Sequence, residues 1–461
     1  MIINYPKKID MTEFLKETST ITKYGLPEEV VYCKKCVISN QRPNTTVEFK
    51  HTAESKKTTI NFNEAGVCDA CVVTEKKNKE IDWKERESEL LILCDKYRSR
   101  NGNYDCLVPG SGGKDSFYAS HILKYKYNMN PLTVTWAPNM YTDWGWSNFQ
   151  AWIHSGMDNY LMTPNGRTHR LLTRLAVDKL LHPFQPFILG QKCFAPKMAI
   201  KFGIPLIFYG EQEAEYGTPV NEAMSSKRDW TFSSIQERDE MYFGGISYES
   251  LKKDFGLTDT DLSIYIPENI KNIKSTSLDF RYLGYYLKWH PQSNYYYAAE
   301  NSDFKAAPER TLGTYSKYNS IDDKIDDFFY YTMGIKFGIG RATTDAAQEI
   351  RSGDITRDEG VLLVKKFDHE YPDRFSDEIF KYLSIDRDNF PIAHKEFEQP
   401  IFDSKYFNDL CNTFRSPHIW KYDNGSWKLR HTVWDDAEKI GLDPSTQNAH
   451  NWVGNPGIDR E

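Results

Sequence analysis

A glycine-rich segment between a predicted strand and a predicted helix constrains this chain more than any other feature. The segment 109–116 reads PGSGGKDS, follows the apolar run DCLVP and precedes a helix expected at 115–127. Small residues let successive backbone N–H groups surround an anion, and the positive end of the helix dipole adds to the attraction. The sequence therefore predicts a phosphate-binding turn.

This turn differs from the Walker A loop. Lys114 is followed by Asp115, where Ser or Thr is needed to hold magnesium, and Val108 occupies the position of a required Gly. We therefore expect nucleotide chemistry other than ordinary γ-phosphoryl transfer.

Short apolar runs alternate with longer helical segments around the turn, which indicates βαβ units and a parallel sheet. The expected strands lie at 105–109, 131–137, 158–162, 185–189 and 204–209, with helices near 115–127, 146–156, 168–182 and 191–202. Beyond Gly217 the strand signal fades, and from about Ile321 the sequence reads as helices. The predicted class is α/β, a parallel sheet with helices on both faces and a mostly helical C-terminal half.

The 461 residues give a prior of about three domains. Changes of pattern along the chain divide it into an extension, a cysteine-containing module, a nucleotide-binding domain, a mostly helical domain and a C-terminal extension. Their predicted bounds are 1–30, 31–74, 75–217, 218–395 and 396–461.

Four of the eight cysteines form two C-x-x-C pairs, namely Cys33, Cys36, Cys68 and Cys71. The 31 residues between the pairs are poor in aliphatic side chains, so this piece needs another source of stability. The spacing predicts a structural Zn²⁺ bound by four thiolates, without which the segment would be disordered. An iron–sulfur cluster and four unrelated free thiols are the alternatives.

The charge balance bears on partners and location. The chain carries 58 Lys and Arg against 65 Asp and Glu, a net charge of −7, which argues against nonspecific nucleic-acid binding. No apolar run approaches the roughly 18 residues of a membrane span, and no apolar stretch follows the basic residues near the start. We expect a cytoplasmic protein that binds neither membrane nor nucleic acid.

Acidic residues follow the strand expected at 204–209, in the segment GEQEAEYG that begins at Gly210. Side chains at the carboxyl end of a parallel strand face the crevice where α/β proteins bind ligands. Mg²⁺ prefers oxygen ligands, so Glu211 and Glu215 are predicted to hold magnesium or its waters. The segment looks like the G-E-x-x-x-[DE] stretch of asparagine synthetases. A solvated acidic turn is the alternative.

Three cations in the helical half are candidates to stabilise charge during a reaction: Lys324, Lys336 and Arg341. Negative charge on the oxygens of a reacting nucleotide needs fixed cations nearby. Solvated helix charges are the alternative for each of them.

The string SGGKDS resembles the SGGxDS loop of the PP-loop ATP pyrophosphatases, which cleave ATP between the α- and β-phosphates and transfer AMP to an acceptor oxygen. The resemblance implies that Ser111, Gly112, Gly113 and Ser116, with Lys114 among them, hold the pyrophosphate portion, and that Asp115 binds Mg²⁺. It also implies main-chain contacts between the adenine and Thr135–Trp136. A chance glycine-rich turn is the alternative.

Taken together, the motifs resemble the N-acetyl sugar amidotransferases of bacterial surface-glycan biosynthesis. The most specific strings are ERTLGTYSKYNSIDDKID (309–326) and IKFGIGRATTDAAQEIRSGDITRDEG (335–360). Further matches are CKKCVISNQRP, CDAC, VPGSGGKDS, IPLIFYGEQEAEYG and YYLKWHPQSNYYYAAEN, which together span most of 31–365. The sequence departs from the pattern at the N-terminal extension, after residue 395, and at Gly110, where a residue such as Val is ordinary.

The resemblance implies conversion of a sugar acetamido group to an acetamidino group. The amide oxygen would first receive AMP from ATP, releasing pyrophosphate, and ammonia would then displace AMP. An enclosed site is expected, because water would hydrolyse the intermediate. The aromatic residues Trp289, Tyr295, Tyr296 and Tyr297 are candidates to cover the sugar, although such clusters are more often core. Candidate sugars are nonulosonic acids of the pseudaminic or legionaminic type and nucleotide-linked N-acetylated hexoses.

The ammonia is expected from a separate partner. Ile2 follows Met1, so no N-terminal Cys is present, and no glutaminase signature surrounds Cys94, Cys106, Cys193 or Cys411. The resemblance implies a glutaminase with a cyclase-like subunit, similar to the pair used in histidine biosynthesis.

Two other functions are compatible with the motifs. A PP-loop tRNA thiolase would need a reactive thiol or an iron–sulfur cluster in the site, and Cys193, with Cys106, is the only candidate near the sheet. A degenerate nucleotide-binding scaffold is the non-catalytic alternative, which the intact Ser111, Asp115 and Glu211 disfavour.

Overall fold

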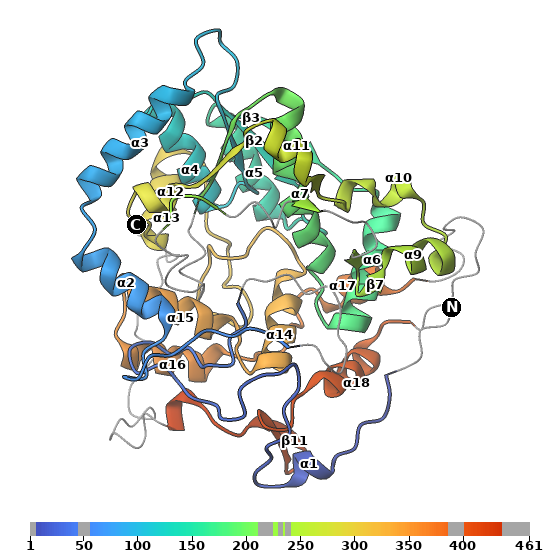
Figure 1. Ribbon diagram of the computed structural model, residues 1–461. Coiled ribbons are helices and arrows are strands. Elements are labelled where there is room, and N and C mark those ends of the chain that lie inside the picture. Colours follow the sequence, from blue (N-terminus) through green and yellow to red (C-terminus); the bar gives the residue numbers. More distant parts are fainter. Residues whose placement is uncertain are drawn as a thin grey trace.

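The upper half of the protein in Figure 1 contains a five-stranded parallel sheet with the order β3-β2-β1-β4-β9. The computed structural model describes residues 6–44, 56–210, 225–228, 234–235, 241–385 and 401–435. The strands are β1 (Cys106–Pro109), β2 (Pro131–Trp136), β3 (Asp158–Met162), β4 (Leu206–Tyr209) and β9 (Asp279–Tyr282). Four of the five predicted strands are therefore confirmed within a few residues.

Alternation along the strands explains why helices cover both faces. Cys106 and Val108 of β1 pack in a cluster with α3 (Trp83–Tyr97), α4 (Lys114–Tyr125) and α12 (Leu283–Tyr286). Leu107 points to the opposite cluster, which includes α7 (Gln185–Phe202) and α11 (Ile270–Ser275). Successive side chains of a strand face opposite sides, so a continuous apolar run requires cover on both. The predicted α/β class is confirmed.

Two strand predictions were wrong. The segment expected as a strand at 185–189 is the start of α7, with Pro186 in its first turn, where a missing N–H costs nothing. Its apolar residues continue at helical spacing for 18 residues, longer than a buried strand. The fifth strand is instead β9, beyond Gly217, where no strand was expected. It is a four-residue strand with half-buried Asp279 and Arg281, so its apolar signal is weak.

The remaining elements of the sheet-containing half are short or peripheral. Its helices are α5 (Asp143–His154), α6 (Gly166–Leu180), α9 (Tyr248–Phe255), α10 (Asp259–Leu262), the 3-10 helix η4 (Ser263–Tyr265) and α13 (Pro291–Asn301). Its minor strands are β5 (Ser234–Ile235), β6 (Tyr242–Phe243), β7 (Ile246–Ser247) and β8 (Glu268–Asn269). The pair β5-β8 is parallel and the pair β6-β7 is antiparallel.

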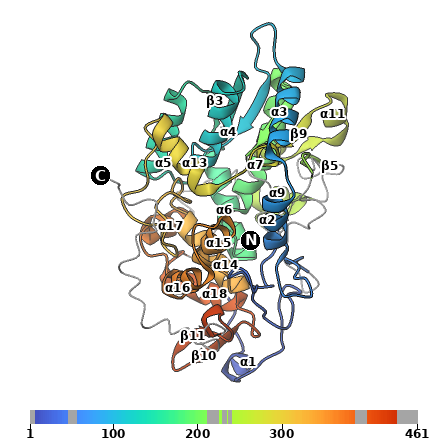
Figure 2. The same cartoon turned by 90° about the vertical axis from the view of Figure 1, so that its left-hand side faces the viewer.

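The second half is mostly helical, as predicted, and lies below the sheet in both views (Figures 1 and 2). Its helices are α14 (Asp326–Phe337), α15 (Arg341–Ser352), α16 (Arg357–Phe367), α17 (Ser376–Leu383) and α18 (Ser404–Phe414). Glycines at 338 and 353 end α14 and α15 in the left-handed conformation, and a Thr356–Glu359 capping box starts α16. Among the described helices, none is long and apolar enough to cross a bilayer.

The two ends of the described chain pack together. Helix α1 (Thr12–Leu15) lies against the hairpin of β10 (Trp420–Asp423) and β11 (Ser426–Leu429), and the Phe14 ring meets the Trp427 ring edge-on at 5.1 Å. Arg430 also donates hydrogen bonds to the carbonyls of Glu13 and Lys16. Segments predicted as separate extensions thus share one small apolar cluster.

The cysteine-containing module precedes the sheet and packs on the helical half. Its short bridges, such as Tyr32 with Ser39 and Phe62 with Cys68, lead into α2 (Asp69–Lys79). The apolar side chains of the module cluster with residues of α15 and α16, including Ala346 and Val361. The module therefore lies beside the start of α15.

Candidate functional site

The predicted phosphate-binding turn connects β1 to α4, as expected. Gly112 adopts φ +90°, and a Cβ there would lie 2.7 Å from Cα of Phe149. A Cβ at Gly110 would lie 2.1 Å from Cβ of Ser116, which explains why Val is excluded at this position. The Gly112 N–H donates to the Ser116 hydroxyl at 3.2 Å, and that hydroxyl donates to the Gly113 carbonyl at 3.0 Å. Hydrogen bonds among its own residues thus hold the turn in this conformation.

This turn forms one wall of a cavity of about 720 Å³. The other walls come from the end of β4, from α7, from the segment 318–348 and from the cysteine-containing module. Their polar lining residues include Arg42, Lys57, Gln185, Arg228, Tyr318, Asp322, Asp326, Tyr330, Arg341 and Asp345. The volume is within the range of small-molecule sites, and polar groups converge on it from segments far apart in the chain.

Asp115 and Lys114 begin α4 beside the turn. Asp115 accepts a hydrogen bond from the Asn294 amide of α13 at 3.0 Å, and its other oxygen lies 2.5 Å from Lys114 Nζ. Lys114 is largely buried although it is charged. Both side chains line the cavity.

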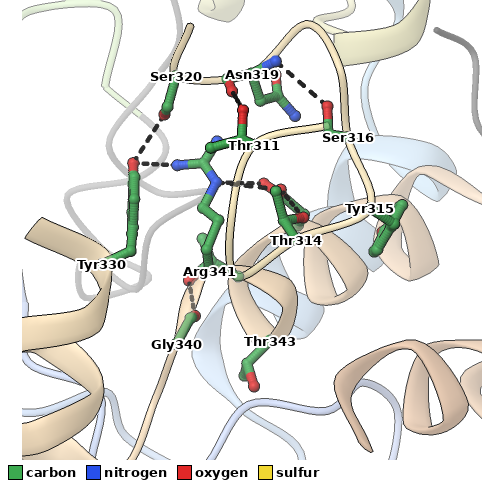
Figure 3. Close-up of polar contacts among 12 residues, drawn as sticks. Thr311, Thr314, Tyr315, Ser316, Asn319, Ser320, Tyr330, Gly340, Arg341 and Thr343 are labelled. Atoms are coloured by element: carbon green, nitrogen blue, oxygen red, sulfur yellow. Dashed lines mark hydrogen bonds and ion pairs between the residues drawn. The ribbon is translucent and has the colours of Figure 1, made fainter. Parts of the chain in front are cut away.

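Arg341, at the start of α15, is held by a polar network (Figure 3). Its Nε lies 3.0 Å from Asp345 Oδ1, and one terminal nitrogen donates to the Tyr330 hydroxyl. Tyr330 in turn contacts the Ser320 hydroxyl at 3.1 Å, and Thr314 donates to Asp345 at 2.7 Å. The network fixes this cation in the cavity wall.

Two further carboxylates face the cavity next to Arg341. The Ser111 hydroxyl hydrogen-bonds to Asp322, which links the helical half directly to the phosphate-binding turn. Burial raises the pKa of Asp322 above its ordinary value. Burial also raises the pKa of Asp326 well above its ordinary value, and the neighbouring Asp322 and Asp323 add to this rise.

The segment 322–324 is anchored by contacts beyond the end of β2. Asp323 accepts hydrogen bonds from the N–H groups of Asn139, at 2.5 Å, and Met140, at 3.2 Å. The Lys324 N–H donates to the Met140 carbonyl at 2.9 Å. The Asp323 carboxylate therefore binds backbone N–H groups, whereas Asp322 and Asp326 on either side of it line the cavity.

Several predicted site residues lie away from the cavity. Lys324 points to Glu378, at 2.6 Å, and Lys336 is fully buried with its Nζ donating to the Leu180 carbonyl at 3.0 Å. Thr135 and Trp136 are buried in β2 and are not part of the cavity lining. Gly210 lines the cavity, whereas Glu211 and Glu215 lie outside the described residues.

The cavity also contains residues that sequence reasoning did not select. Tyr318, Asp322 and Asp326 belong to the string ERTLGTYSKYNSIDDKID. In the sequence, Asp322 and Asp326 look like solvated charges beside Asp323. Arg42 and Lys57 come from the cysteine-containing module, which carried no sequence signal for ligand binding. His182 also lines the cavity and stacks on Phe329.

The four paired cysteines converge on one point. Every Sγ lies within 4.8 Å of the others and all four residues are buried. Cys33 and Cys71 are 3.9 Å apart, and Cys36 and Cys68 are 3.7 Å apart. A tetrahedral ion with bonds of about 2.3 Å holds its sulfurs about 3.8 Å apart. The thiols thus fit a single ion, and the Cys36 and Cys68 N–H groups point at Cys33 Sγ as they would at a thiolate.

Comparisons with known proteins give partial matches. Residues 312–433 match the family described as LPS biosynthesis protein WbpG-like, C-terminal domain. A stretch of 84 residues is 33% identical to an uncharacterized protein of Methanocaldococcus jannaschii. The aligned stretch covers 18% of this chain and 29% of that protein. The U34-tRNA thiolase NcsA from Methanococcus maripaludis, solved with its 4Fe–4S cluster, aligns over 67% of this chain and 86% of its own, with 11% identity and a TM-score of 0.21. The chain thus matches less than a third of the length of the curated relative.

Proposed function

We propose that the protein is an ATP-dependent amidotransferase of bacterial surface-glycan biosynthesis, which converts a sugar acetamido group to an acetamidino group. The observation that carries this proposal is the shared cavity. The phosphate-binding turn forms one wall, and residues within the WbpG-like stretch 312–433, among them Tyr318 and Arg341, form the opposite wall. The predicted nucleotide site and the stretch that matches a glycan-biosynthesis family thus line the same cavity, which supports the proposal.

The reaction begins with the amide oxygen of the acetamido group. This oxygen attacks the α-phosphorus of ATP and pyrophosphate leaves, so that AMP becomes bonded to the former amide oxygen. The N–H groups of the turn and the start of α4 bind the pyrophosphate portion. Arg341 stabilises negative charge from the opposite wall. Ammonia then attacks the activated carbon, and AMP departs with the oxygen.

Magnesium and zinc have separate proposed sites. Asp115, with Glu211 and Glu215 as the remaining predicted ligands, would hold Mg²⁺, which neutralises charge on the pyrophosphate. Cys33, Cys36, Cys68 and Cys71 would hold a structural Zn²⁺, since their sulfurs fit one tetrahedral ion. A cubane iron–sulfur cluster binds each cysteine to a different iron and needs wider spacing.

The thiolase alternative needs a reactive sulfur in the cavity. Within the described part of the chain, no cysteine lines the cavity. Cys193 is buried, and burial raises its pKa to about 12, which opposes formation of a reactive thiolate. Burial raises the pKa of Cys106 as well. These features favour amide activation over sulfur transfer.

The test is mass spectrometry of products. The protein is incubated with Mg-ATP, ammonium chloride and a panel of diacetamido nonulosonic acids and UDP-N-acetylhexosamines. A product in which NH replaces one oxygen, formed together with AMP and pyrophosphate, supports the proposal. Because ammonia is expected from a separate glutaminase and cyclase-like partner, glutamine alone should give no product. AMP formation only with tRNA would contradict the proposal.

A variant pair tests the site. Asp115→Asn should reduce AMP formation at least 100-fold, because the carboxylate at the turn is lost, while the far-ultraviolet circular dichroism stays unchanged. The matched control is Asp143→Asn, which changes an exposed acid in the first turn of α5. Full activity in Asp115→Asn would refute the proposed magnesium ligand.

A further inference from the structure

Four carboxylates line the cavity among the described residues, and three of them already have partners. Asp115 contacts Lys114 and Asn294, and Asp345 contacts Arg341 and Thr314. Asp322 accepts the Ser111 hydroxyl. Asp326 differs from these three in its surroundings.

The Asp326 carboxylate makes no hydrogen bond or ion pair within the described part of the chain, although only 9% of the residue is exposed. Buried carboxylates in folded proteins almost always have partners, because desolvation without a hydrogen bond is costly. The hydroxyl of Tyr318, another cavity-lining residue, is also buried without a partner among the described residues. Two unpartnered polar groups in one wall indicate a place for a polar ligand.

Asp326 is also held at a defined position relative to the phosphate-binding turn. It lies four residues after Asp322, which is hydrogen-bonded to Ser111 of the turn. The Asp326 N–H donates to the Asp323 carbonyl at 3.1 Å. Asp323 is fixed in turn by Asn139 and Met140. From this position the Asp326 side chain lines the cavity.

The proposed amidination needs a proton acceptor at this stage. When ammonia forms a bond to the activated carbon, its nitrogen becomes a cationic ammonium group within a tetrahedral intermediate. One proton must leave this nitrogen before the C–O bond to AMP breaks with its electron pair moving to oxygen. The nitrogen lone pair then forms the C=N bond, which gives a positively charged amidinium.

We propose that the Asp326 carboxylate takes this proton from the attacking nitrogen and then pairs with the amidinium product. The inference rests on the proposed function. Asp326 releases the proton to solvent when the product leaves, so the cycle is balanced. The adjacent Arg341 guanidinium faces the departing phosphate and leaves Asp326 to act on the nitrogen. A cation that adjoins Asp326 favours its carboxylate form, which is the form that accepts a proton.

The test separates the two half-reactions. Adenylation is followed as acceptor-dependent exchange of labelled pyrophosphate into ATP without ammonium, and amidination as amidine formation with ammonium, using the acceptor from the sugar panel that gives product. Asp326→Asn should keep exchange within about threefold of wild type and should lower amidine formation about 100-fold or more. The substitution preserves shape and removes a buried acid, so folding should be retained.

A second variant makes the result specific to proton transfer. Asp326→Ala leaves space for a small carboxylate, so added formate should restore amidine formation in a concentration-dependent way. Asp377→Asn, an exposed acid in the first turn of α17, is the matched control and should change neither half-reaction.

Equal loss of exchange and amidination in Asp326→Asn, or no formate rescue in Asp326→Ala, would overturn the role of Asp326. Absence of both activities in the wild-type protein would overturn the proposed function, and the inference with it. The two failures are thus distinguishable.

Discussion

At the scale of single residues, Gly112 shows how tightly the phosphate-binding turn is built. Its φ of +90° strains any other residue, and a Cβ would press on the Phe149 backbone at 2.7 Å. The strain alone costs about 1–3 kcal/mol, and the collision must be relieved by moving the turn. Because α5 holds Phe149 in the core, we expect the turn to move rather than the helix.

Gly112→Ala should therefore weaken ATP binding at least tenfold, measured by isothermal titration calorimetry, with only a modest loss of thermal stability. The matched control is Gly102→Ala, because Gly102 has φ +83° and no atom within 4 Å of an added Cβ. It has the same backbone strain without the collision. Equal ATP affinity in Gly112→Ala and wild type would contradict a phosphate-binding role for the turn.

A second prediction at this scale concerns Glu349 of α15 and the pH dependence of the stability of the fold. Burial raises its pKa to about 8, and the Tyr315 hydroxyl donates to it at 2.7 Å. A carboxyl whose pKa is higher in the folded state stabilises the fold below its unfolded pKa of 4.5, and this contribution is lost as pH rises through 8. Glu349 thus makes unfolding easier, by on the order of a few kcal/mol, as pH rises from about 5 to 8.

Glu349→Gln should flatten this pH dependence in thermal denaturation followed by circular dichroism, because glutamine still accepts from Tyr315 and cannot ionise. Burial also raises the pKa values of Asp323 and Asp327, to about 7 and about 6. Part of the decline in stability with rising pH should therefore remain in this variant. Glu300→Gln, at an exposed position, should leave the curve unchanged. An unaltered curve in Glu349→Gln would argue against the buried neutral acid.

The run SIDDKIDD shows the limit of sequence reasoning at this scale. Lys324 was chosen as a candidate because cations suit pyrophosphate chemistry, yet it points to Glu378. The cavity is lined instead by Asp322 and Asp326, and Asp323 serves the backbone. Charge type alone cannot separate these roles, because the direction of each side chain depends on where the segment crosses the end of β2.

At the scale of elements, strands with continuous apolar runs were predictable and others were not. β2 is fully buried and matches its predicted position, because both of its faces are covered. The run at 185–189 is equally apolar but belongs to a buried helix, and periodicity cannot separate the two cases over five residues. β9 is half polar, so its place at the sheet edge follows only from pairing with β4.

The turn between β1 and α4 was predictable because its local sequence determines its conformation. Turn, strand end and helix start are contiguous, and the backbone N–H groups that bind an anion need only small residues at fixed spacing. The opposite wall depends on α14, α15 and the loop before them, which reach the cavity through tertiary packing. That placement is a property of the fold, and no local spacing encodes it.

At the scale of the whole molecule, the cysteine-containing module completes the cavity. Arg42 donates to the Thr344 hydroxyl of α15 at 3.2 Å and lines the cavity, as does Lys57. The apolar side chains of the module pack on α15 and α16. A module of this size with few aliphatic residues is expected to depend on a bound metal for folding, with a binding free energy of about 10 kcal/mol or more. Metal at the cysteines is therefore expected to control the cavity wall.

Cys68→Ala should lose the bound metal, measured as zinc per chain by inductively coupled plasma mass spectrometry, and should expose the segment 31–74 to limited proteolysis. The sheet should stay folded, because its clusters are separate from the module. Displacement of Arg42 and Lys57 should weaken binding of ATP or of the sugar. Cys94→Ala, which changes a buried cysteine outside the cluster, is the matched control and should keep metal and activity. Iron with visible absorption in place of zinc would contradict the single-ion site, and unchanged binding in the metal-free variant would separate the module from the cavity.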